Sequence, residues 1–114
     1  MPEFMTPREL FTFAAKLRTL MENKDIPEHI NRVARRLGLL GCLDTRIGSR
    51  SSQSIITTSE RKRISIGYEI IPEPPLLLLD EPTSGLDAMT SLRITELMRR
   101  EADSGGKAVL AVIH

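Results

Sequence analysis

Two adjacent acidic residues follow a run of leucines in the stretch LLLLDEPTSGLD, residues 76–87. The leucines predict a buried β-strand, which places Asp80 and Glu81 at its carboxyl end. Paired carboxylates at a sheet edge are costly unless a cation lies beside them, and a divalent metal with a phosphate is the common solution. One acid can then hold Mg²⁺ while the other orients or deprotonates an attacking water. The letters LLLLDE alone are equally consistent with a strand that ends in solvated acids.

A second apolar strand is predicted for KAVLAVIH, residues 107–114, and a helix for TSLRITELMRREA, residues 90–102, between the strands. Strand, helix and strand in that order, with both strands apolar on both faces, indicate a βαβ unit in a buried parallel sheet. The fold class is therefore α/β. Ligands of such sheets bind beyond the carboxyl ends of the strands, where Asp80, Glu81 and His114 all fall.

Two amphipathic helices are predicted in the first part of the chain. The first runs from Pro7 to about Leu20, since Thr6 and Glu9 match a capping box around it. Its predicted core face consists of Leu10, Phe13, Ala14 and Leu17. The second is opened by Pro27 and Glu28 and closed by Gly38, and its predicted core face consists of Ile30, Val33, Ala34 and Leu37. His29 is expected on the polar, solvated side.

The Ser- and Thr-rich stretch 44–59 predicts a loop, and ERKRISIGYEII, residues 60–71, predicts a third helix that Pro72, Pro74 and Pro75 terminate. Its basic residues 61–63 are expected to form a solvated first turn. With 114 residues, 27% of them charged, and a formal charge of +1, the chain shows no bias toward nucleic acid or membrane surfaces. Its one cysteine, Cys42, fits a reducing compartment and a packed side chain, and the chain as written is expected to be soluble.

The stretch DEPTSGLD, residues 80–87, resembles the Walker B motif and D-loop of ABC-type ATPases. The neighbouring segments agree in order and spacing with the G subfamily of ABC transporters, the White and pleiotropic-drug-resistance type. Residues 6–18 resemble that subfamily's segment past the Q-loop, residues 37–48 its link into the signature motif, and residues 60–70 its helix after the signature.

This resemblance implies an α/β fold that is part of a P-loop NTPase (RecA-like) parallel-sheet core with an ABC helical subdomain. Residues 1–71 would be the helical subdomain, with the signature at 56–60, and residues 72–114 the Walker B, D-loop and switch-histidine part of the catalytic core. The implied cofactors are ATP and Mg²⁺. Asp80 would hold Mg²⁺ through water, Glu81 would be the catalytic carboxylate, and His114 would contact the γ-phosphate. The implied D-loop residues, which would cross a dimer interface, are Ser84, Gly85, Leu86 and Asp87.

The signature motif departs from the family pattern LSGGQ, because the chain has ITTSE at residues 56–60. The resemblance implies that Thr57, Thr58, Ser59 and Glu60 face an ATP held by a partner domain. Thr58 and Ser59 put side chains where glycine leaves room for backbone N–H groups to approach phosphate, so weakened contact is expected. We therefore expect one degenerate and one competent site per transporter.

A P-loop is also missing from the sequence. Only Gly106 precedes a lysine, and Glu101 and Ala108 stand where the motif G-x-x-x-x-G-K-[ST] requires Gly and Ser or Thr. The expected entity is thus a fragment without its P-loop half, which alone would bind ATP poorly and hydrolyse none.

The function implied is that of an ATP-hydrolysing domain of a membrane exporter for lipids or hydrophobic drug-like compounds. Its partners would be a second nucleotide-binding domain and a transmembrane domain, without nucleic acid, and it would lie at the cytosolic face of the membrane. Two alternatives stay open: a non-catalytic or regulatory nucleotide-binding domain, and a soluble ABC ATPase.

Overall fold

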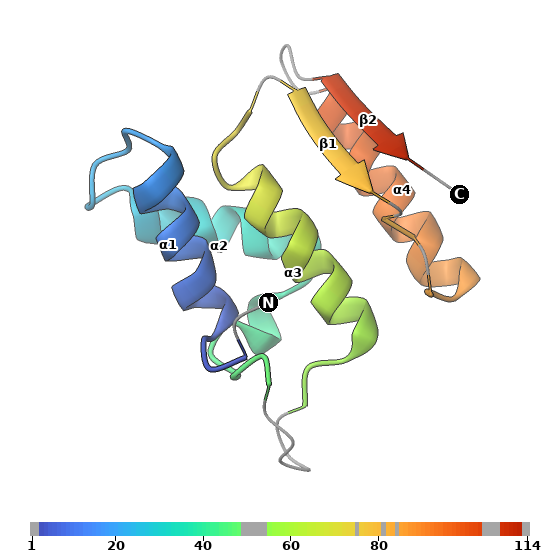
Figure 1. Ribbon diagram of the computed structural model, residues 1–114, viewed down its shortest axis with the longest axis horizontal. Helices are drawn as coiled ribbons and strands as arrows, with labels where there is room; N and C mark the ends of the chain where they lie inside the picture. Colours follow the sequence, from blue (N-terminus) through green and yellow to red (C-terminus); the bar gives the residue numbers. More distant parts are fainter. Residues whose placement is uncertain are drawn as a thin grey trace.

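A computed structural model of the chain describes residues 3–48, 55–74, 76–80, 82–83, 85–103 and 108–112. Its elements in chain order are α1 (Pro7–Arg18), α2 (Ile26–Leu37), the 3₁₀ helix η1 (Leu40–Cys42), α3 (Thr58–Ile70), β1 (Leu76–Asp80), α4 (Ala88–Asp103) and β2 (Ala108–Val112). Helices α1, α2 and α3 pack against one another, and α4 lies with the two strands beside this helical group (Figure 1).

Helix α1 begins as predicted, with a reciprocal capping box. The Glu9 N–H donates to Thr6 Oγ1 at 3.1 Å, and the Thr6 N–H donates to Glu9 Oε1 at 3.0 Å. The helix ends at Arg18, two residues before the predicted Leu20, because Thr19 adopts an extended conformation and its N–H bonds to Ala15 O at 3.2 Å.

The buried face of α1 differs from the predicted one. Phe13 and Leu17 are 50% and 66% exposed. The buried residues of the helix after Pro7 are Leu10, Phe11, Ala14 and Ala15. The reason is that α1 packs against both α2 and α3, and this double contact takes the side of the helix that carries Phe11 and Ala15.

Helix α2 buries Ile30, Val33, Ala34 and Leu37 as predicted. It ends at Gly38, whose φ of +68° is the left-handed cap conformation that glycine adopts without strain. The prediction of a solvated His29 is wrong. His29 is 3% exposed, and its Nε2 lies 2.8 Å from the Ile71 carbonyl oxygen at the end of α3. Its spacing from Ile26 and Val33, three and four residues away, places it on the apolar face.

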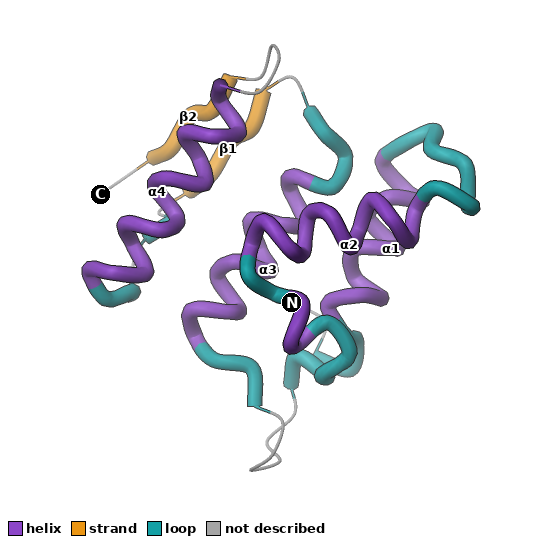
Figure 2. The backbone as a smooth tube through the Cα atoms, turned by 180° about the vertical axis from the view of Figure 1, so that it is seen from behind, coloured by secondary structure: helices purple, strands orange, loops and turns teal. Residues whose placement is uncertain are grey.

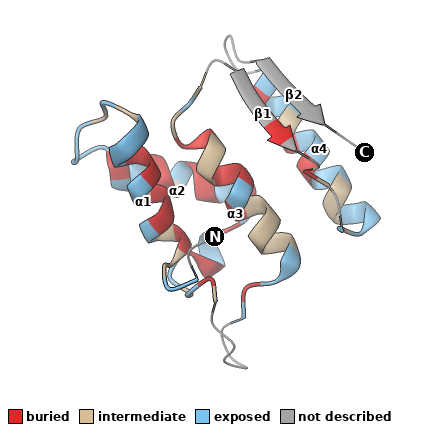
Figure 3. Ribbon diagram, in the orientation of Figure 1, coloured by how far each residue is buried: buried red, intermediate tan, exposed pale blue. Residues whose placement is uncertain are grey.

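Buried residues concentrate where α1, α2 and α3 face one another (Figure 3). Gly67 permits this close packing, because a Cβ atom at residue 67 would lie 2.6 Å from Phe11 Cζ and 2.9 Å from Leu37 Cδ1. Helix α3 is thus held on one side by α1 and on another by α2.

Strands β1 and β2 pair in parallel, in the register Leu76↔Ala108 through Asp80↔Val112. Helix α4 connects them and lies against the strands, as the view from behind shows (Figure 2). The predicted parallel strand pair is therefore confirmed, and it is the full extent of the sheet within the described residues. Across those same residues, no helix is long and apolar enough to cross a bilayer.

Candidate functional site

The carboxyl end of β1 carries the first predicted site residue. Asp80 is the last residue of the strand and stands in register with Val112 of β2, so both strands end at one edge of the sheet. Leu79, just before it, is 6% exposed and anchors the strand in the core. Glu81, Ser84 and His114 lie outside the described residues, and their roles remain predictions.

A tight turn leads from β1 into α4. The Leu86 N–H donates to Thr83 O at 3.3 Å, and Gly85 has a φ of +76°, the left-handed region that favours glycine. Pro82 is fully buried, and Leu86 packs against the hydrophobic core. Gly85 and Leu86 of the predicted D-loop thereby fix the direction in which the chain leaves the strand.

Asp87 caps helix α4. Its Oδ1 accepts the Thr90 N–H at 2.7 Å, and its carbonyl oxygen accepts the Ser91 N–H at 2.9 Å. The hydrogen bond from the Thr90 backbone holds the pKa of the Asp87 carboxyl below its usual value. This carboxylate is exposed, and it stabilises the positive end of the helix. Its proposed contact with a partner domain is a separate role that the cap does not require.

The predicted signature segment forms the start of α3. Thr57 is the N-cap: its Oγ1 accepts the Glu60 N–H at 3.1 Å, and Glu60 Oε1 accepts the Thr57 N–H at 2.9 Å. Ile56 is buried, whereas Thr57 and Thr58 are exposed. The pattern Thr-x-x-Glu signals such a capping box in the sequence alone, as it does at Thr6.

The start of α3 fits a bound phosphate only in part. A helix N-terminus attracts anions through its free N–H groups and its dipole. Here the Glu60 carboxylate already lies at that end and takes the Thr57 N–H, while the Thr57 hydroxyl takes the Glu60 N–H. Among the first-turn donors, only the N–H groups of Thr58 and Ser59 are left without an intrahelical partner. A phosphate at this helix end would thus find fewer free N–H donors than at an uncapped helix, and it would lie near the negative charge of Glu60.

Cys42 is packed close to this capping box. Burial, reinforced by the negative charge of Glu60, raises the pKa of the Cys42 thiol to about 11. The thiol points to the Leu39 carbonyl oxygen at 3.5 Å. The prediction that Cys42 is a packed side chain is confirmed.

Arginines gather in a cleft that the sequence reading missed. A polar cleft of about 230 Å³ lies between the end of α2, the start of α3 and α4. Ser59 of the predicted signature and Thr90, just after the predicted D-loop, both line it. Its basic residues are Arg35, Arg36, Arg63, Arg93 and Arg100. Arg93 and Arg100 lie seven residues apart and so share one face of α4. This spacing is the pattern in the sequence that indicates a basic face on the helix.

Two basic residues near the start of α3 donate hydrogen bonds to backbone carbonyl groups. Arg61 donates to Ile47 O at 2.7 Å, and Arg63 donates to Leu37 O at 2.9 Å and Gly38 O at 3.3 Å. The prediction of a solvated basic turn at residues 61–63 is therefore wrong for both arginines. They satisfy carbonyl groups of the loop before the signature and of the end of α2.

An ion pair joins α2 to α4. Arg36 Nη1 lies 3.1 Å from Glu101 Oε1, and the Glu101 side chain is only 3% exposed. Because Glu101 belongs to the predicted catalytic part and Arg36 to the predicted helical subdomain, this contact crosses the boundary that the sequence reading placed at residues 71 and 72.

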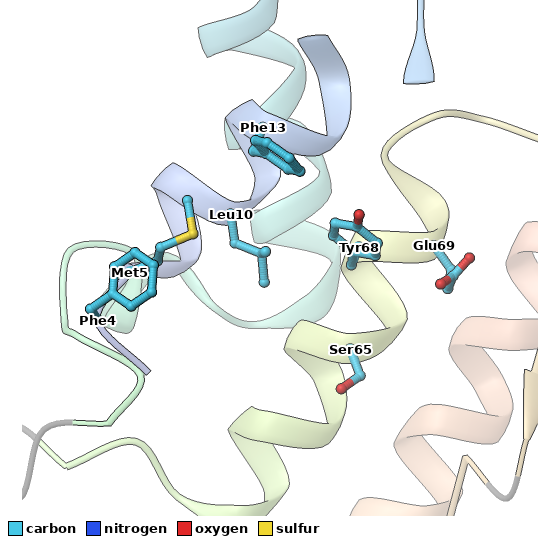
Figure 4. A pocket seen from close by; sticks show the side chains of 7 residues that line it. All are labelled: Phe4, Met5, Leu10, Phe13, Ser65, Tyr68 and Glu69. Atoms are coloured by element: carbon cyan, nitrogen blue, oxygen red, sulfur yellow. The ribbon is translucent and has the colours of Figure 1, made fainter. Parts of the chain in front are cut away.

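A larger hollow of about 590 Å³ lies between the N-terminal segment, α1 and α3. It is lined by Phe4, Met5, Leu10, Phe13, Ser65, Tyr68 and Glu69 (Figure 4). The lining is mostly apolar, and its one carboxylate, Glu69, pairs with Arg18 at 3.5 Å. None of these residues belongs to the predicted site, and the hollow offers no arrangement of reactive groups.

The described residues contain no group of three or more His, Cys, Asp or Glu side chains that converge for a metal. The residue predicted to hold Mg²⁺ through water, Asp80, is placed by its strand at the edge where a ligand of a parallel sheet binds. The role of Asp80 in holding Mg²⁺ stays a prediction.

Comparison with known proteins identifies several relatives of the chain. It is 46% identical over 113 residues to ABC transporter G family member 22 of Arabidopsis thaliana and 36% identical over 110 residues to member 5 of the same plant. It is 39% identical over 112 residues to the broad substrate specificity ATP-binding cassette transporter ABCG2 of Mus musculus. Each alignment covers 96% of the chain but only 15%, 17% and 17% of the respective relative. No protein-family model matches the chain.

The parallel βαβ unit, the helical group beside it and these matches define part of an ATP-binding cassette protein. More specifically, the chain belongs to the ABC transporter G family and corresponds to part of its nucleotide-binding domain. This homology implies a P-loop NTPase fold, of which the described residues contain one parallel strand pair.

Proposed function

We propose that the chain is part of the ATP-hydrolysing domain of a membrane exporter, with residues 1–71 in the helical subdomain and 72–114 in the catalytic core. The observation that carries this proposal is the match of nearly the whole chain to ABC transporters of the G family. The position of Asp80 at the carboxyl edge of a parallel strand pair supports it.

The proposed roles are those that the resemblance to the family implies. Bound ATP would supply the phosphoryl group that is transferred to water, with ADP as the leaving group, and bound Mg²⁺ would neutralise the charge on the phosphate oxygens. Asp80 would hold Mg²⁺ through water, Glu81 would orient and deprotonate the attacking water, and His114 would contact the terminal phosphate. Ser84, Gly85, Leu86 and Asp87 contact a second nucleotide-binding domain.

The signature segment is expected to bind nucleotide weakly. Thr57, Thr58, Ser59 and Glu60 face the nucleotide of the partner domain, and the Glu60 carboxylate at the start of α3 reduces the attraction of that helix for phosphate. The site built on Glu81 takes its signature from the partner and stays competent. The transporter therefore has two unequal sites.

We propose that the complete protein acts at the cytosolic face of a membrane, together with a transmembrane domain, and exports lipids or hydrophobic drug-like compounds. A second candidate function is that of a non-catalytic or regulatory nucleotide-binding domain. The charge of Glu60 favours this second candidate, because a carboxylate at the start of α3 opposes the binding of a phosphate there.

The deciding experiment is Glu81→Gln in the full-length transporter that contains this segment, with ATP turnover and ATP binding measured together. Loss of a general base is expected to lower turnover by about 10²-fold or more and to leave nucleotide binding in place. The matched control, Glu69→Gln, removes an exposed carboxylate outside the predicted site and should change neither. Unchanged turnover in Glu81→Gln would favour the non-catalytic candidate.

A second experiment tests the unequal sites. Glycine at both residue 58 and residue 59 restores the space of the family signature, so Thr58→Gly with Ser59→Gly is expected to raise turnover. Equal turnover before and after the change would show that the altered signature does not limit the enzyme.

A further inference from the structure

The arginine cleft, defined by the lining residues of α2, α3 and α4 given above, concentrates positive charge. Among the described residues, five arginines and one carboxylate, Glu96, line it, although the whole chain has a formal charge of only +1. Charges of one sign that line a concave surface focus the electrostatic field and raise the local concentration of anions.

Two of the five arginines already have partners in the protein. The Arg36 guanidinium pairs with the buried Glu101 carboxylate at 3.1 Å. The Arg63 guanidinium donates to Leu37 O, Gly38 O and the hydroxyl oxygen of Ser59. These two residues line the wall of the cleft, and their guanidinium groups already interact with acceptors of the protein.

The other three arginines, Arg35, Arg93 and Arg100, form no ion pair within the described part of the chain, and all three are exposed. Arg93 and Arg100 project from one face of α4, and Arg35 belongs to the last turn of α2. Glu96 lies between Arg93 and Arg100 along α4, and Asp87 lies near Arg93, so two carboxylates offset part of this charge. The remaining positive charge raises the free energy of the folded chain unless an anion joins it.

We propose that the arginine cleft binds a phosphate group of an oligophosphate or phosphate ester, held by Arg35, Arg93 and Arg100. Guanidinium groups match the oxygens of phosphate with paired N–H donors and stay charged at every physiological pH. Ser59 and Thr90 line the same cleft and contribute hydroxyl groups, which donate hydrogen bonds to phosphate oxygens.

The charge of the cleft favours a phosphate over a carboxylate. A phosphate group carries up to two negative charges and three or more acceptor oxygens, whereas a carboxylate carries one charge and two oxygens. Three guanidinium groups without an ion pair in the described residues line the cleft, so the more highly charged anion matches them better.

This inference goes beyond the proposed ATPase function and does not rest on it. The three arginines that carry it lie on α2 and α4 and are not among the predicted site residues; Ser59, which adds a hydroxyl group, is the one lining residue shared with the predicted signature. Loss of turnover in Glu81→Gln tests the function, and phosphate binding without Mg²⁺ tests the cleft.

The test is a titration of the 114-residue chain with sodium tripolyphosphate, without Mg²⁺, followed by backbone amide and arginine side-chain NMR signals. The spectrum reports folding and binding in one measurement. Arg93→Gln with Arg100→Gln removes two charge-assisted partners and is expected to raise the Kd by more than about tenfold. Arg99→Gln, an exposed neighbour on α4 outside the cleft, is the matched control and is expected to leave the Kd within about twofold.

Further arms identify the source of the phosphate and the competing anion. Phosphatidylcholine vesicles with and without phosphatidylinositol phosphate show whether the group is a lipid head group, and free tripolyphosphate shows whether it is soluble; binding in either form that is weakened by the double variant supports the proposal. A hexaglutamate peptide tests an acidic protein segment. The proposal is overturned if tripolyphosphate does not shift the cleft signals, if Arg99→Gln weakens binding as much as the double variant does, or if hexaglutamate binds more tightly.

Discussion

At the scale of single residues, the segment 56–60 has a structural role besides its predicted contact with nucleotide. Thr58 and Ser59 stand where the family motif LSGGQ has two glycines. The structure shows that the flanking pair, Thr57 and Glu60, closes a reciprocal cap at the start of α3. The segment therefore stabilises a helix whether or not it contacts nucleotide.

Thr57→Ala is expected to lower the free energy of unfolding by about 1 kcal/mol, because the Glu60 N–H loses its side-chain acceptor. Thr57→Ser keeps a hydroxyl and should retain most of that stability. Urea unfolding followed by circular dichroism gives both values. Equal stability of the Ala and Ser variants would show that the cap contributes nothing.

Residue-scale prediction from sequence succeeded where a local pattern was sufficient. The cap at Thr6, the left-handed stop at Gly38 and the packed Cys42 all follow from short-range rules. The cap at Thr57 follows from the same rule as the cap at Thr6. The resemblance of this segment to a nucleotide-contacting motif hides that rule.

At the scale of elements, α3 is the helix on which the helical group is built. It contacts α1, α2 and β1, and at Gly67 its backbone lies directly against the side chains of Phe11 and Leu37. Glycine in the middle of a helix weakens it by roughly 1 kcal/mol relative to alanine, so Gly67 is retained here for packing.

Gly67→Ala is expected to destabilise the chain by about 1–3 kcal/mol despite the better helix propensity of alanine, because the added methyl group would overlap Phe11 and Leu37. The control is Gly41→Ala, where a Cβ atom has no described neighbour within 4 Å. Thermal and urea unfolding of the two variants give the comparison. A Gly67→Ala chain as stable as Gly41→Ala would mean that α1 and α3 separate easily.

The sequence predicted the α-helices α1 to α4 and both strands of the described residues, with bounds to within a few residues, because hydrophobic periodicity and caps are properties of each segment alone. It did not predict the short 3₁₀ helix η1. It did not predict which side of α1 is buried or that His29 is covered. Both depend on which neighbour a helix meets, and the periodicity of α1 allows two stripes that share Leu10 and Ala14.

At the scale of the whole molecule, the helical group and the strand pair are joined by more than the chain between α3 and β1. Arg36 of α2 pairs with the buried Glu101 of α4, and the arginine cleft opens beside this pair. The predicted boundary at residues 71 and 72 is thus crossed by a side-chain contact.

Arg36→Met keeps the apolar stem of the side chain and removes the charge that faces Glu101, and we expect a loss of more than about 1 kcal/mol of unfolding free energy. Arg32→Met, which removes only an exposed pair with Glu28 one turn away, should cost less than about 0.5 kcal/mol. Chemical denaturation at low and high salt separates the two cases. Equal losses in both variants would mean that the α2–α4 contact does not stabilise the arrangement.

The meeting of Ser59, Thr90 and the arginines could not be predicted from the sequence, since these residues come from three helices and no short-range rule brings them together. The direction of β1, by contrast, could be predicted, because parallel strands joined by a helix end at one edge.

The packed state of Cys42 has a consequence for oxidation. Oxidants such as peroxide attack the thiolate, and a pKa of about 11 leaves almost none of it at neutral pH. Because Cys42 is the only cysteine of the chain, folded molecules have no exposed sulfur nucleophile with which to form a covalent dimer. Disulfide-linked dimers in a stored sample would therefore form from molecules that had unfolded. The fraction of dimer would report how much of the protein had unfolded under oxidising conditions.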